Sequence, residues 1–227
     1  SYAEATAMPS EKLPHIDLEL FNGLGGFAND GTEYVIELDG WRRTPAPWVN
    51  LISNKNFGCI CTESGPGYTF CMNSRENKLT EWSNDPLLNR LPEIIYFKDM
   101  DSDDVFCTTI QPLRAKGPYR ITHGFGYTKY QRNSNGFNQE MTIFVSKSAK
   151  LKYTLVSLEN TSDNERNLSV YYYADLVLGL NHDSEMPYLF TDYDSSMGII
   201  TAENIYTTHY KGYLAYMYSE LPLESYT

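Results

Sequence analysis

Two stretches decide the fold class: Leu151-Lys-Tyr-Thr-Leu-Val-Ser-Leu-Glu-Asn160 and Leu168-Ser-Val-Tyr-Tyr-Tyr-Ala-Asp-Leu-Val177. Both are rich in β-branched, aromatic and leucine side chains, which favour extended backbone. Between them lies the polar segment Ser162-Asp-Asn-Glu-Arg166, whose composition is typical of a turn. We therefore predict two strands, Leu151–Asn160 and Leu168–Val177, that pair with each other as an antiparallel hairpin.

The strand pattern continues in both directions from these two stretches. We predict further strands at Glu33–Leu38, Trp48–Ile52, Phe57–Thr62, Tyr68–Met72, Glu93–Lys98, Val105–Ile110, Tyr119–Gln131, Phe137–Ser146, Met197–Ala202 and Gly212–Ser219. Turn signals separate them, among them Gly65-Pro-Gly67 and Asn133-Ser-Asn-Gly136. Helical periodicity is limited to one short turn over Leu87 to Leu91, and no fixed-period repeat occurs. Many short strands at this spacing predict an all-β protein, a large antiparallel β-sandwich.

The domain organisation is simple. Residues 1–15, with Pro9 and Pro14, have the mixed composition of a leader or linker, and residues 16–227 form the predicted β-sandwich domain. The last residues, Glu224-Ser-Tyr-Thr227, contain neither a closing turn nor a polar tail. We expect from this that the chain is part of a longer protein.

Composition narrows the functional classes. The chain has 19 Tyr, 10 Phe and 3 Trp, and 41% of its residues are hydrophobic, so it can bury a core rather than remain disordered. Acidic residues outnumber basic ones by 29 to 18, which gives a net charge of −11. Nucleic acid is a disfavoured partner, because its binding depends on clustered Lys and Arg. An acidic surface rich in Tyr suits a neutral ligand such as a sugar.

Membrane and compartment signals are also absent from the sequence. There is no apolar run near the length of a membrane span and no visible signal peptide, so we expect no membrane partner. The four cysteines, Cys59, Cys61, Cys71 and Cys107, do not form a dense disulfide pattern. We expect reduced thiols and a cytoplasmic protein.

The segment Asn22-Gly-Leu-Gly-Gly-Phe27 superficially resembles a phosphate-binding glycine loop. A dinucleotide-binding loop leads into a helix whose N-terminus holds the phosphate, whereas a predicted strand follows these glycines. We therefore interpret the segment as a tight turn between strands.

The segment Thr44-Pro-Ala-Pro-Trp-Val-Asn50 places a tryptophan on a backbone that two prolines keep extended. Trp48 in this position can stack on a sugar ring, or it can fill the core. Core packing is the more common fate of a tryptophan, so it is the favoured interpretation.

The most informative stretch is Asn73-Ser-Arg-Glu-Asn-Lys-Leu-Thr-Glu-Trp-Ser-Asn-Asp-Pro86, which we call the polar block. Amides, carboxylates, an arginine and an aromatic face are the groups that bind sugar hydroxyls and rings. The alternative is a polar loop whose side chains bond their own backbone. Together with neighbouring aromatic residues, the block provides our candidates for a carbohydrate site or a protein interface: Trp48, Tyr68, Asn73, Arg75, Glu76, Asn77, Trp82, Asn84 and Asp85.

No catalytic or metal-binding constellation stands out. Glu76 and Asp85 offer a carboxylate pair, but the sequence does not fix their separation, on which glycoside cleavage depends. The histidines lack metal-ligand spacing, and His123 lies within a predicted strand, where a structural role is favoured. Cys59 and Cys61 lack the spacing of a zinc or redox pair, and buried packing is favoured for them. We predict no catalytic residue, no metal ligand and no cofactor.

Five ordered motifs resemble family 94 glycoside phosphorylases, formerly glycosyltransferase family 36. They are Phe21-Asn-Gly-Leu-Gly-Gly-Phe27, Asp30-Gly-Thr-Glu-Tyr-Val-Ile36, Thr44-Pro-Ala-Pro-Trp-Val-Asn50, Ser64-Gly-Pro-Gly-Tyr68 and the polar block. The polar block is most similar to the branch of cyclic β-1,2-glucan synthases and 1,2-β-oligoglucan phosphorylases. The resemblance covers residues 20 to 227.

The resemblance implies a galactose-mutarotase-like supersandwich that precedes an (α/α)6 barrel in a homodimeric enzyme. In that family the barrel carries the catalytic acid, and inorganic phosphate, a co-substrate, attacks the sugar with inversion to release α-glucose 1-phosphate. It further implies an oligosaccharide substrate, here a β-glucan, and a supporting role for the polar block at the acceptor side or at a subunit contact. Because no barrel motif is present, we expect this chain alone to be inactive. The alternatives are a stand-alone glycan-binding module and a docking or dimerisation domain without sugar contact.

Overall fold

A computed structural model describes residues 12–207 and 209–227 and confirms the all-β prediction. The strands are β1 (Gly25–Ala28), β2 (Glu33–Leu38), β3 (Val49–Ser53), β4 (Phe57–Thr62), β5 (Gly65–Cys71), β6 (Lys78–Thr80), β7 (Glu93–Asp99), β8 (Val105–Phe106), β9 (Tyr119–Gly124), β10 (Tyr127–Ser134), β11 (Phe137–Val145), β12 (Lys152–Asn160), β13 (Leu168–Ala174), β14 (Leu176–Gly179), β15 (Leu189–Asp194), β16 (Ile199–Asn204) and β17 (Ala215–Tyr218). Helical structure in the described residues consists of α1 (His182–Glu185) and the 3₁₀ turn η1 (Met186–Tyr188). None of these helices is both long and apolar enough to cross a membrane. Most of the predicted leader, residues 1–11, lies outside the described part of the chain.

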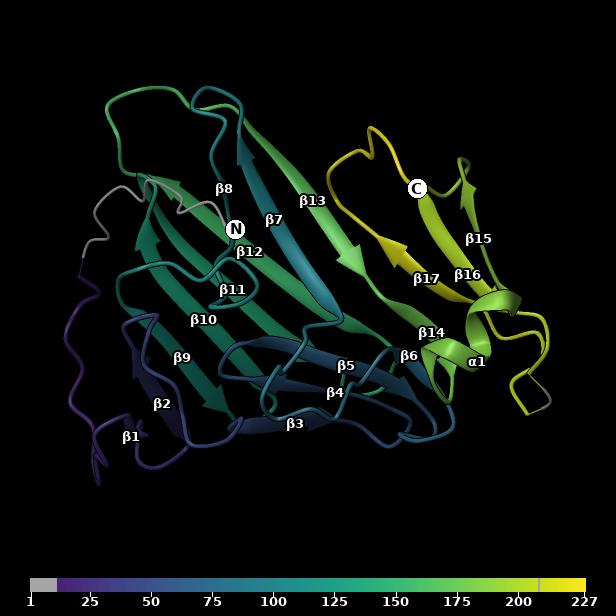
Figure 1. Cartoon of the computed structure of the whole chain (residues 1–227), viewed down its shortest axis with the longest axis horizontal. Coiled ribbons are helices and arrows are strands. Elements are labelled where there is room, and N and C mark those ends of the chain that lie inside the picture. The colour runs from purple at the N-terminus through teal and green to yellow at the C-terminus, as the bar shows by residue number, and fades with distance from the viewer. Residues whose placement is uncertain (1–11, 208) are drawn as a thin grey trace.

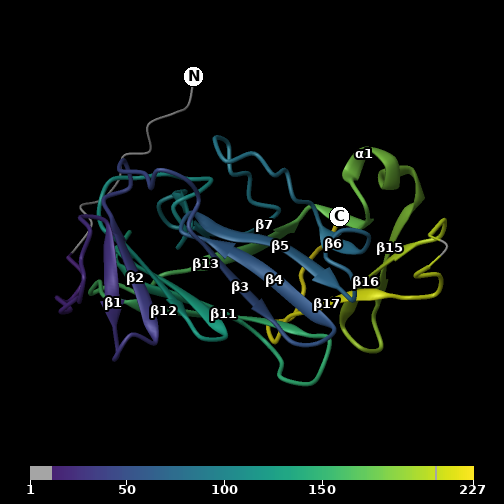
Figure 2. The same cartoon turned by 90° about the horizontal axis from the view of Figure 1, so that it is seen from below.

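The strands form four antiparallel sheets (Figure 1). A six-stranded sheet has the order β1-β2-β9-β10-β11-β12, and a five-stranded sheet has the order β14-β6-β5-β4-β3. A small sheet, β13-β7-β8, lies beside them, and the sheet β15-β16-β17 lies at the opposite side of the molecule from β1 and β2. Figure 2 shows β3, β4 and β5 running together as one layer.

The largest hydrophobic core lies between the six-stranded and the five-stranded sheet. It joins Ile36 of β2, Ile121 of β9 and Ile143 of β11 to Ile52 of β3 and Cys59 of β4, all of them at most 2% exposed. The strands supply this core because their side chains alternate between faces: along β10 every second residue is buried. Burial of this apolar surface is the main favourable contribution to folding.

The turn predicted at Asn133-Ser-Asn-Gly136 is confirmed. Ser134 pairs with Phe137, so Asn135 and Gly136 alone connect β10 to β11, and both have positive φ, 56° and 77°. This is the backbone of a type I′ hairpin turn, which asparagine and glycine tolerate because the left-handed region costs them little.

The hairpin predicted between Leu151–Asn160 and Leu168–Val177 is wrong, although both strands exist. β12 pairs with β11 in the six-stranded sheet, whereas β13 pairs with β7 in a different sheet. The second strand also breaks after Ala174, and Val177 belongs to β14. Alternation of side chains reveals which residues share a face but not which strand is the partner, so it could not distinguish the two pairings.

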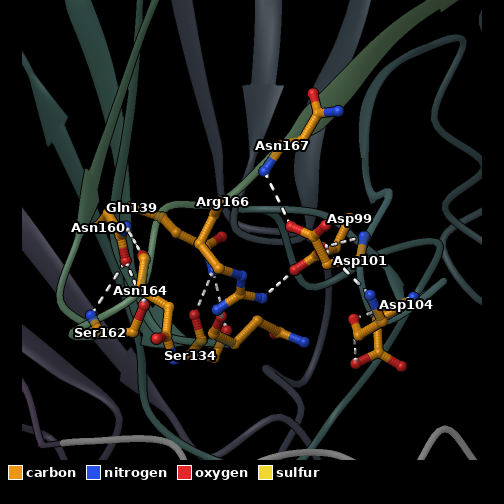
Figure 3. A network of polar contacts seen from close by, with 12 residues as sticks. Asp99, Asp101, Asp104, Ser134, Gln139, Asn160, Ser162, Asn164, Arg166 and Asn167 are labelled. Atoms are coloured by element: carbon orange, nitrogen blue, oxygen red, sulfur yellow. Dashed lines mark hydrogen bonds and ion pairs between the residues drawn. The ribbon is translucent and has the colours of Figure 1, made fainter.

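Polar contacts of the segment between the two strands explain the crossover (Figure 3). The Arg166 guanidinium forms an ion pair with Asp99 at the end of β7. The central carbon of the same guanidinium, Cζ, lies over the Phe137 ring, 5.1 Å from its centroid. The backbone N–H of Asn167 donates to Asp101 at 3.2 Å. These contacts place Leu168 opposite Asp99, which begins the β13–β7 ladder. Residues 161–167 are therefore a bridge between sheets rather than a hairpin turn.

Several smaller expectations need correction. The predicted strand Tyr119–Gln131 is the hairpin β9–β10, which turns at Phe125 and Gly126. Gly65-Pro-Gly67 is the start of β5 and not a turn, and the extended run predicted over Val105–Ile110 is a strand only at Val105–Phe106. Strands β1, β6 and β15 were not predicted, because few of their residues alternate; β1 begins inside the segment that was interpreted as a tight turn, and β14 was predicted only as the end of Leu168–Val177. By contrast, the predicted bounds of β2 and β4 are confirmed.

Candidate functional site

The polar block connects β5 to the loop before β7 and contains β6. Its amides and carboxylates mostly bond the backbone nearby. Asn73 Oδ1 accepts from the N–H groups of Arg75 and Glu76, both at 2.9 Å, and the buried Asn77 donates to the Cys71 carbonyl at 2.9 Å. Asp85 Oδ1 accepts from the backbone N–H groups of Leu87 and Leu88, at 2.9 and 3.1 Å. For these three side chains the geometry favours the alternative of a self-bonded polar loop.

Other candidates in the block remain open to solvent. Arg75 and Asn84 are exposed, as is Glu76, whose carboxylate lies 3.4 Å from the Arg75 guanidinium. Asn84 has a positive φ of 47°, which asparagine tolerates better than other residues with a Cβ. The block therefore leaves an arginine, a carboxylate, an amide and its one tryptophan accessible to solvent.

Tyr68 and Trp82 form a stacked pair. Their ring centroids are 5.0 Å apart, and their planes differ by only 9°. Tyr68 is 4% exposed and fixes one face of the indole, while Trp82 is 43% exposed. Burial raises the pKa of Tyr68, and its bond with Ser74 opposes that shift. A rigid, half-exposed indole is the kind of surface on which a sugar ring can stack.

Trp48 contributes to the core, as the sequence favoured. The half-buried indole packs against the main hydrophobic cluster, with its ring 5.8 Å from the Tyr34 ring. The Trp48 carbonyl accepts from Nε2 of His123 at 3.1 Å, so Nδ1 of that ring accepts from the Thr128 hydroxyl at 3.0 Å. Burial lowers the pKa of His123 to about 4, which keeps this structural histidine neutral at pH 7.

One pocket brings together parts of three sequence motifs: the proline-rich segment, the start of the Ser64-to-Tyr68 motif and the end of the polar block. It has a volume of about 200 Å³, and we call it the arginine pocket. Its walls come from the loop between β2 and β3, the β4–β5 turn, the end of the polar block and the loop before β9. The lining residues are Leu38, Arg42, Arg43, Thr44, Pro45, Ala46, Pro47, Glu63, Ser64, Pro86, Leu87, Asn89, Ile110, Gln111 and Arg114.

Glu63 lines this pocket and holds neighbouring segments together by hydrogen bonds. It is 6% exposed, and its carboxylate accepts from the Thr44 hydroxyl at 2.9 Å and from the Trp48 N–H at 2.8 Å. The Ser64 hydroxyl lies 3.4 Å from the same carboxylate. Glu63 thereby joins the proline-rich segment to the β4–β5 turn, two motifs that lie apart in the sequence.

None of the nine predicted site residues lines the arginine pocket, although the backbone N–H of Trp48 donates to Glu63, which does line it. Sequence reasoning missed Glu63, Gln111 and Arg114, because they lie outside the motifs and meet only in the folded chain. One signal was available: Arg42 and Arg43 directly precede the proline-rich segment. Elsewhere in residues 12–207 and 209–227, no group of three His, Cys, Asp or Glu residues is arranged to hold a metal ion.

Cys59 and Cys61 are both buried, in agreement with the packing role that the sequence favoured. A register shift in the β4–β5 ladder lies between them. All four cysteines are free thiols. Burial raises the pKa of the Cys107 thiol to about 12, so this residue is a poor nucleophile.

Comparison with known proteins adds independent information. Residues 32–227 match a family described as glycosyl hydrolase 94, supersandwich domain. The chain is 35% identical over 225 residues to the cyclic beta-(1,2)-glucan synthase NdvB of Rhizobium meliloti (strain 1021), which is 99% of this chain and 8% of that protein. It is 30% identical over 154 residues to an N,N'-diacetylchitobiose phosphorylase of Vibrio proteolyticus, 66% of this chain and 19% of the relative. A 3-O-beta-D-glucopyranosyl-beta-D-glucuronide phosphorylase of Paenibacillus borealis is 27% identical over 148 residues, 65% of this chain and 18% of the relative. The chain thus spans less than a fifth of each of these relatives.

Proposed function

Since this chain belongs to the glycosyl hydrolase 94 supersandwich domains, we propose that it is the N-terminal carbohydrate-handling domain of an inverting glycoside phosphorylase. In the reaction, phosphate attacks the anomeric carbon and the glycosidic bond breaks with inversion, as in inverting hydrolysis with phosphate in place of water. The product is α-glucose 1-phosphate. The proposed substrates are β-1,2-linked gluco-oligosaccharides, and the observation that supports them is the 35% identity to a cyclic β-1,2-glucan synthase over 99% of this chain.

We assign no catalytic residue to this chain. The proposed contribution of the polar block is to shape the sugar-binding side of a site completed by an (α/α)6 barrel in the same protein. Its exposed side chains suit that contribution, because the same block that carries the half-exposed indole of Trp82 also leaves Arg75, Glu76 and Asn84 open to solvent. The side chains that bond their own backbone hold this surface in place.

Phosphorolysis of defined oligosaccharides tests the proposal. The polypeptide encoded by the whole reading frame around this chain is expected to release glucose 1-phosphate from β-1,2-gluco-oligosaccharides only when phosphate is present. The 227-residue chain alone is expected to release none. Cellobiose, laminaribiose and N,N'-diacetylchitobiose serve as linkage and sugar controls. Turnover by the isolated chain, or a preference for one of the control sugars, contradicts the proposal.

A docking role has its own support. The outer strands β12 and β13 have free edges among the described residues and expose apolar side chains, as does β17. The exposed residues are Tyr153, Leu155, Val156, Val170, Tyr171, Tyr172, Tyr173, Tyr216 and Tyr218. Monomeric proteins seldom leave such surfaces uncovered. We propose that they pack on the rest of a cytoplasmic, homodimeric enzyme, and sedimentation of the whole polypeptide tests the dimer.

Replacement of Trp82 by alanine tests whether the polar block touches sugar directly. If it does, the isolated chain binds β-1,2-glucan, and the substitution weakens binding by roughly tenfold, because an aromatic contact with a ligand contributes on the order of 1 kcal/mol. Titration calorimetry at millimolar glucan measures the effect. Trp41→Ala is the matched control, since Trp41 is 63% exposed and lies outside the polar block. Absence of heat with the wild-type chain rejects direct sugar contact and leaves the docking role.

A further inference from the structure

The arginine pocket concentrates positive charge on an acidic protein. The chain has eight arginines and a net charge of −11, yet Arg42, Arg43 and Arg114 line this one pocket. Glu63 is the only carboxylate in its lining. The formal charge of the lining is therefore three minus one, or +2.

The three guanidinium groups are not neutralised by ion pairing within the described chain. None of them lies in an ion pair with a carboxylate of residues 12–207 or 209–227. The Glu63 oxygens accept from the neutral donors Thr44 and Trp48 instead. Two carboxylates act on these arginines from longer range: the Glu63 charge acts on Arg114, and the backbone N–H of Arg42, followed by its charge, lowers the pKa of Asp39, which lies outside the lining. Three like charges with one carboxylate in the lining still repel each other, so a bound anion would stabilise this arrangement.

Two of the arginines are held in place by the backbone. Arg42 donates to the Gly23 carbonyl at 2.9 Å, and Arg114 donates to the Gly40 carbonyl. Arg114 is partly buried, and burial followed by the charge of Arg43 lowers the pKa of its guanidinium. Each guanidinium has five N–H donors, so most of them remain available to a ligand.

The neutral part of the lining is polar as well. Asn89, Gln111 and Ser64 line the same pocket, and backbone and side-chain bonds fix their loops relative to one another. The Gln111 backbone N–H donates to the Ser64 carbonyl at 3.1 Å, and the Asn89 side chain donates to the Thr62 hydroxyl at 3.2 Å. The volume of about 200 Å³ accommodates a small ligand with a few hydroxyl groups.

We propose that the arginine pocket is a binding site for a phosphate dianion, either inorganic phosphate or the phosphate group of a small ester. Guanidinium groups bind phosphate oxygens in a bidentate manner, and a dianion balances the +2 charge of the lining, whereas a carboxylate would balance half of it. All residues of the site belong to this chain, so phosphate binding here can be tested separately from the proposed phosphorolysis.

Titration of the 227-residue chain at low ionic strength tests the site, by calorimetry and by phosphorus NMR of the titrant. The titrants are inorganic phosphate, glucose 1-phosphate, glucose, and sodium chloride at matched ionic strength. Phosphate or its ester is expected to bind with a millimolar or lower Kd, while glucose and chloride produce no saturable signal. Tighter binding of the ester identifies a sugar phosphate as the ligand, and equal binding identifies the free anion.

Arg43→Gln is the decisive variant, because the Arg43 side chain is exposed and makes no hydrogen bond to the described residues, so the fold should survive. It is expected to raise the Kd roughly tenfold. Arg75→Gln changes the net charge equally but lies outside the pocket, and it should leave the Kd unchanged. Circular dichroism verifies that both variants are folded. No saturable binding at about 10 mM phosphate, or equal weakening by both variants, overturns the proposal.

Discussion

Replacement of Glu93 by alanine is expected to lower the free energy of unfolding by about 3–5 kcal/mol, the usual cost of leaving one member of a buried ion pair alone. Glu93 lies in β7 and is 3% exposed. Thr69 and Thr80 donate to its Oε1 at 2.6 and 3.0 Å, the Tyr172 hydroxyl donates to Oε2 at 3.0 Å, and the Lys152 ammonium pairs with Oε2. These partners come from β5, β6, β13 and β12, so one carboxylate joins three sheets.

The same carboxylate makes stability depend on pH. Burial raises the pKa of Glu93, but the Lys152 charge and the hydrogen bonds from Lys152, Thr69 and Tyr172 outweigh it, and the pKa lies below its ordinary value. A depressed carboxyl pKa contributes stability above the unfolded-state pKa, and that contribution is lost as the pH falls through the folded-state pKa. We expect acid destabilisation below about pH 4 that is weaker in Glu93→Gln.

Urea denaturation followed by circular dichroism measures both effects. Glu140→Gln is the control, because Glu140 pairs with Lys129 on the surface and its loss should cost less than about 1 kcal/mol. The double variant Glu93→Gln/Lys152→Met should recover part of the stability, since it removes both charges together. A loss below about 1 kcal/mol for Glu93→Ala would show that the carboxylate does not hold the sheets together.

The sequence predicted the strands better than their partners. The bounds of β2 and β4 followed from apolar alternation between turn residues, and the Asn-Gly turn followed from the backbone that those residues tolerate. The prediction that β12 pairs with β13 failed because β13 forms its ladder with β7, whose paired residues lie 69 to 81 positions earlier in the chain. Local composition carries no information on such a distant ladder.

The candidate site was only partly predictable for the same reason. The polar block could be located by composition, yet Asn73, Asn77 and Asp85 bond their own backbone, and short-range bonding and ligand binding use the same residue types. The stack of Tyr68 on Trp82 and the gathering of Arg42 with Arg114 depend on loops that meet only after folding.

Replacement of Asp99 is expected to lower stability about as much as replacement of Glu93. It acts at a different place, the connection between β12 and β13. Asp99 ends β7, and its side chain is 1% exposed. Burial raises its pKa, but the bond from Arg166 and the backbone N–H groups of Asp101 and Ser102 outweigh that effect and lower it. Because the Arg166–Asp99 pair fixes the crossover between sheets, Asp99→Ala should lower the free energy of unfolding by about 3–5 kcal/mol.

A double-mutant cycle separates two contributions of Asp99 to stability: its ion pair with Arg166, and its hydrogen bonds to the backbone of the turn that follows β7. Asp99→Asn keeps an oxygen for the N–H groups of Asp101 and Ser102, at 2.8 and 3.3 Å, but leaves Arg166 without a counter-charge. Arg166→Met leaves Asp99 alone, and the double variant removes both charges, so a non-additive recovery measures the pair itself. Lys98→Met is the control, because the Lys98–Asp103 pair of the same hairpin is exposed and its loss should change stability little. Additive losses in the cycle would mean that Arg166 acts through its contact with Phe137 and not through Asp99.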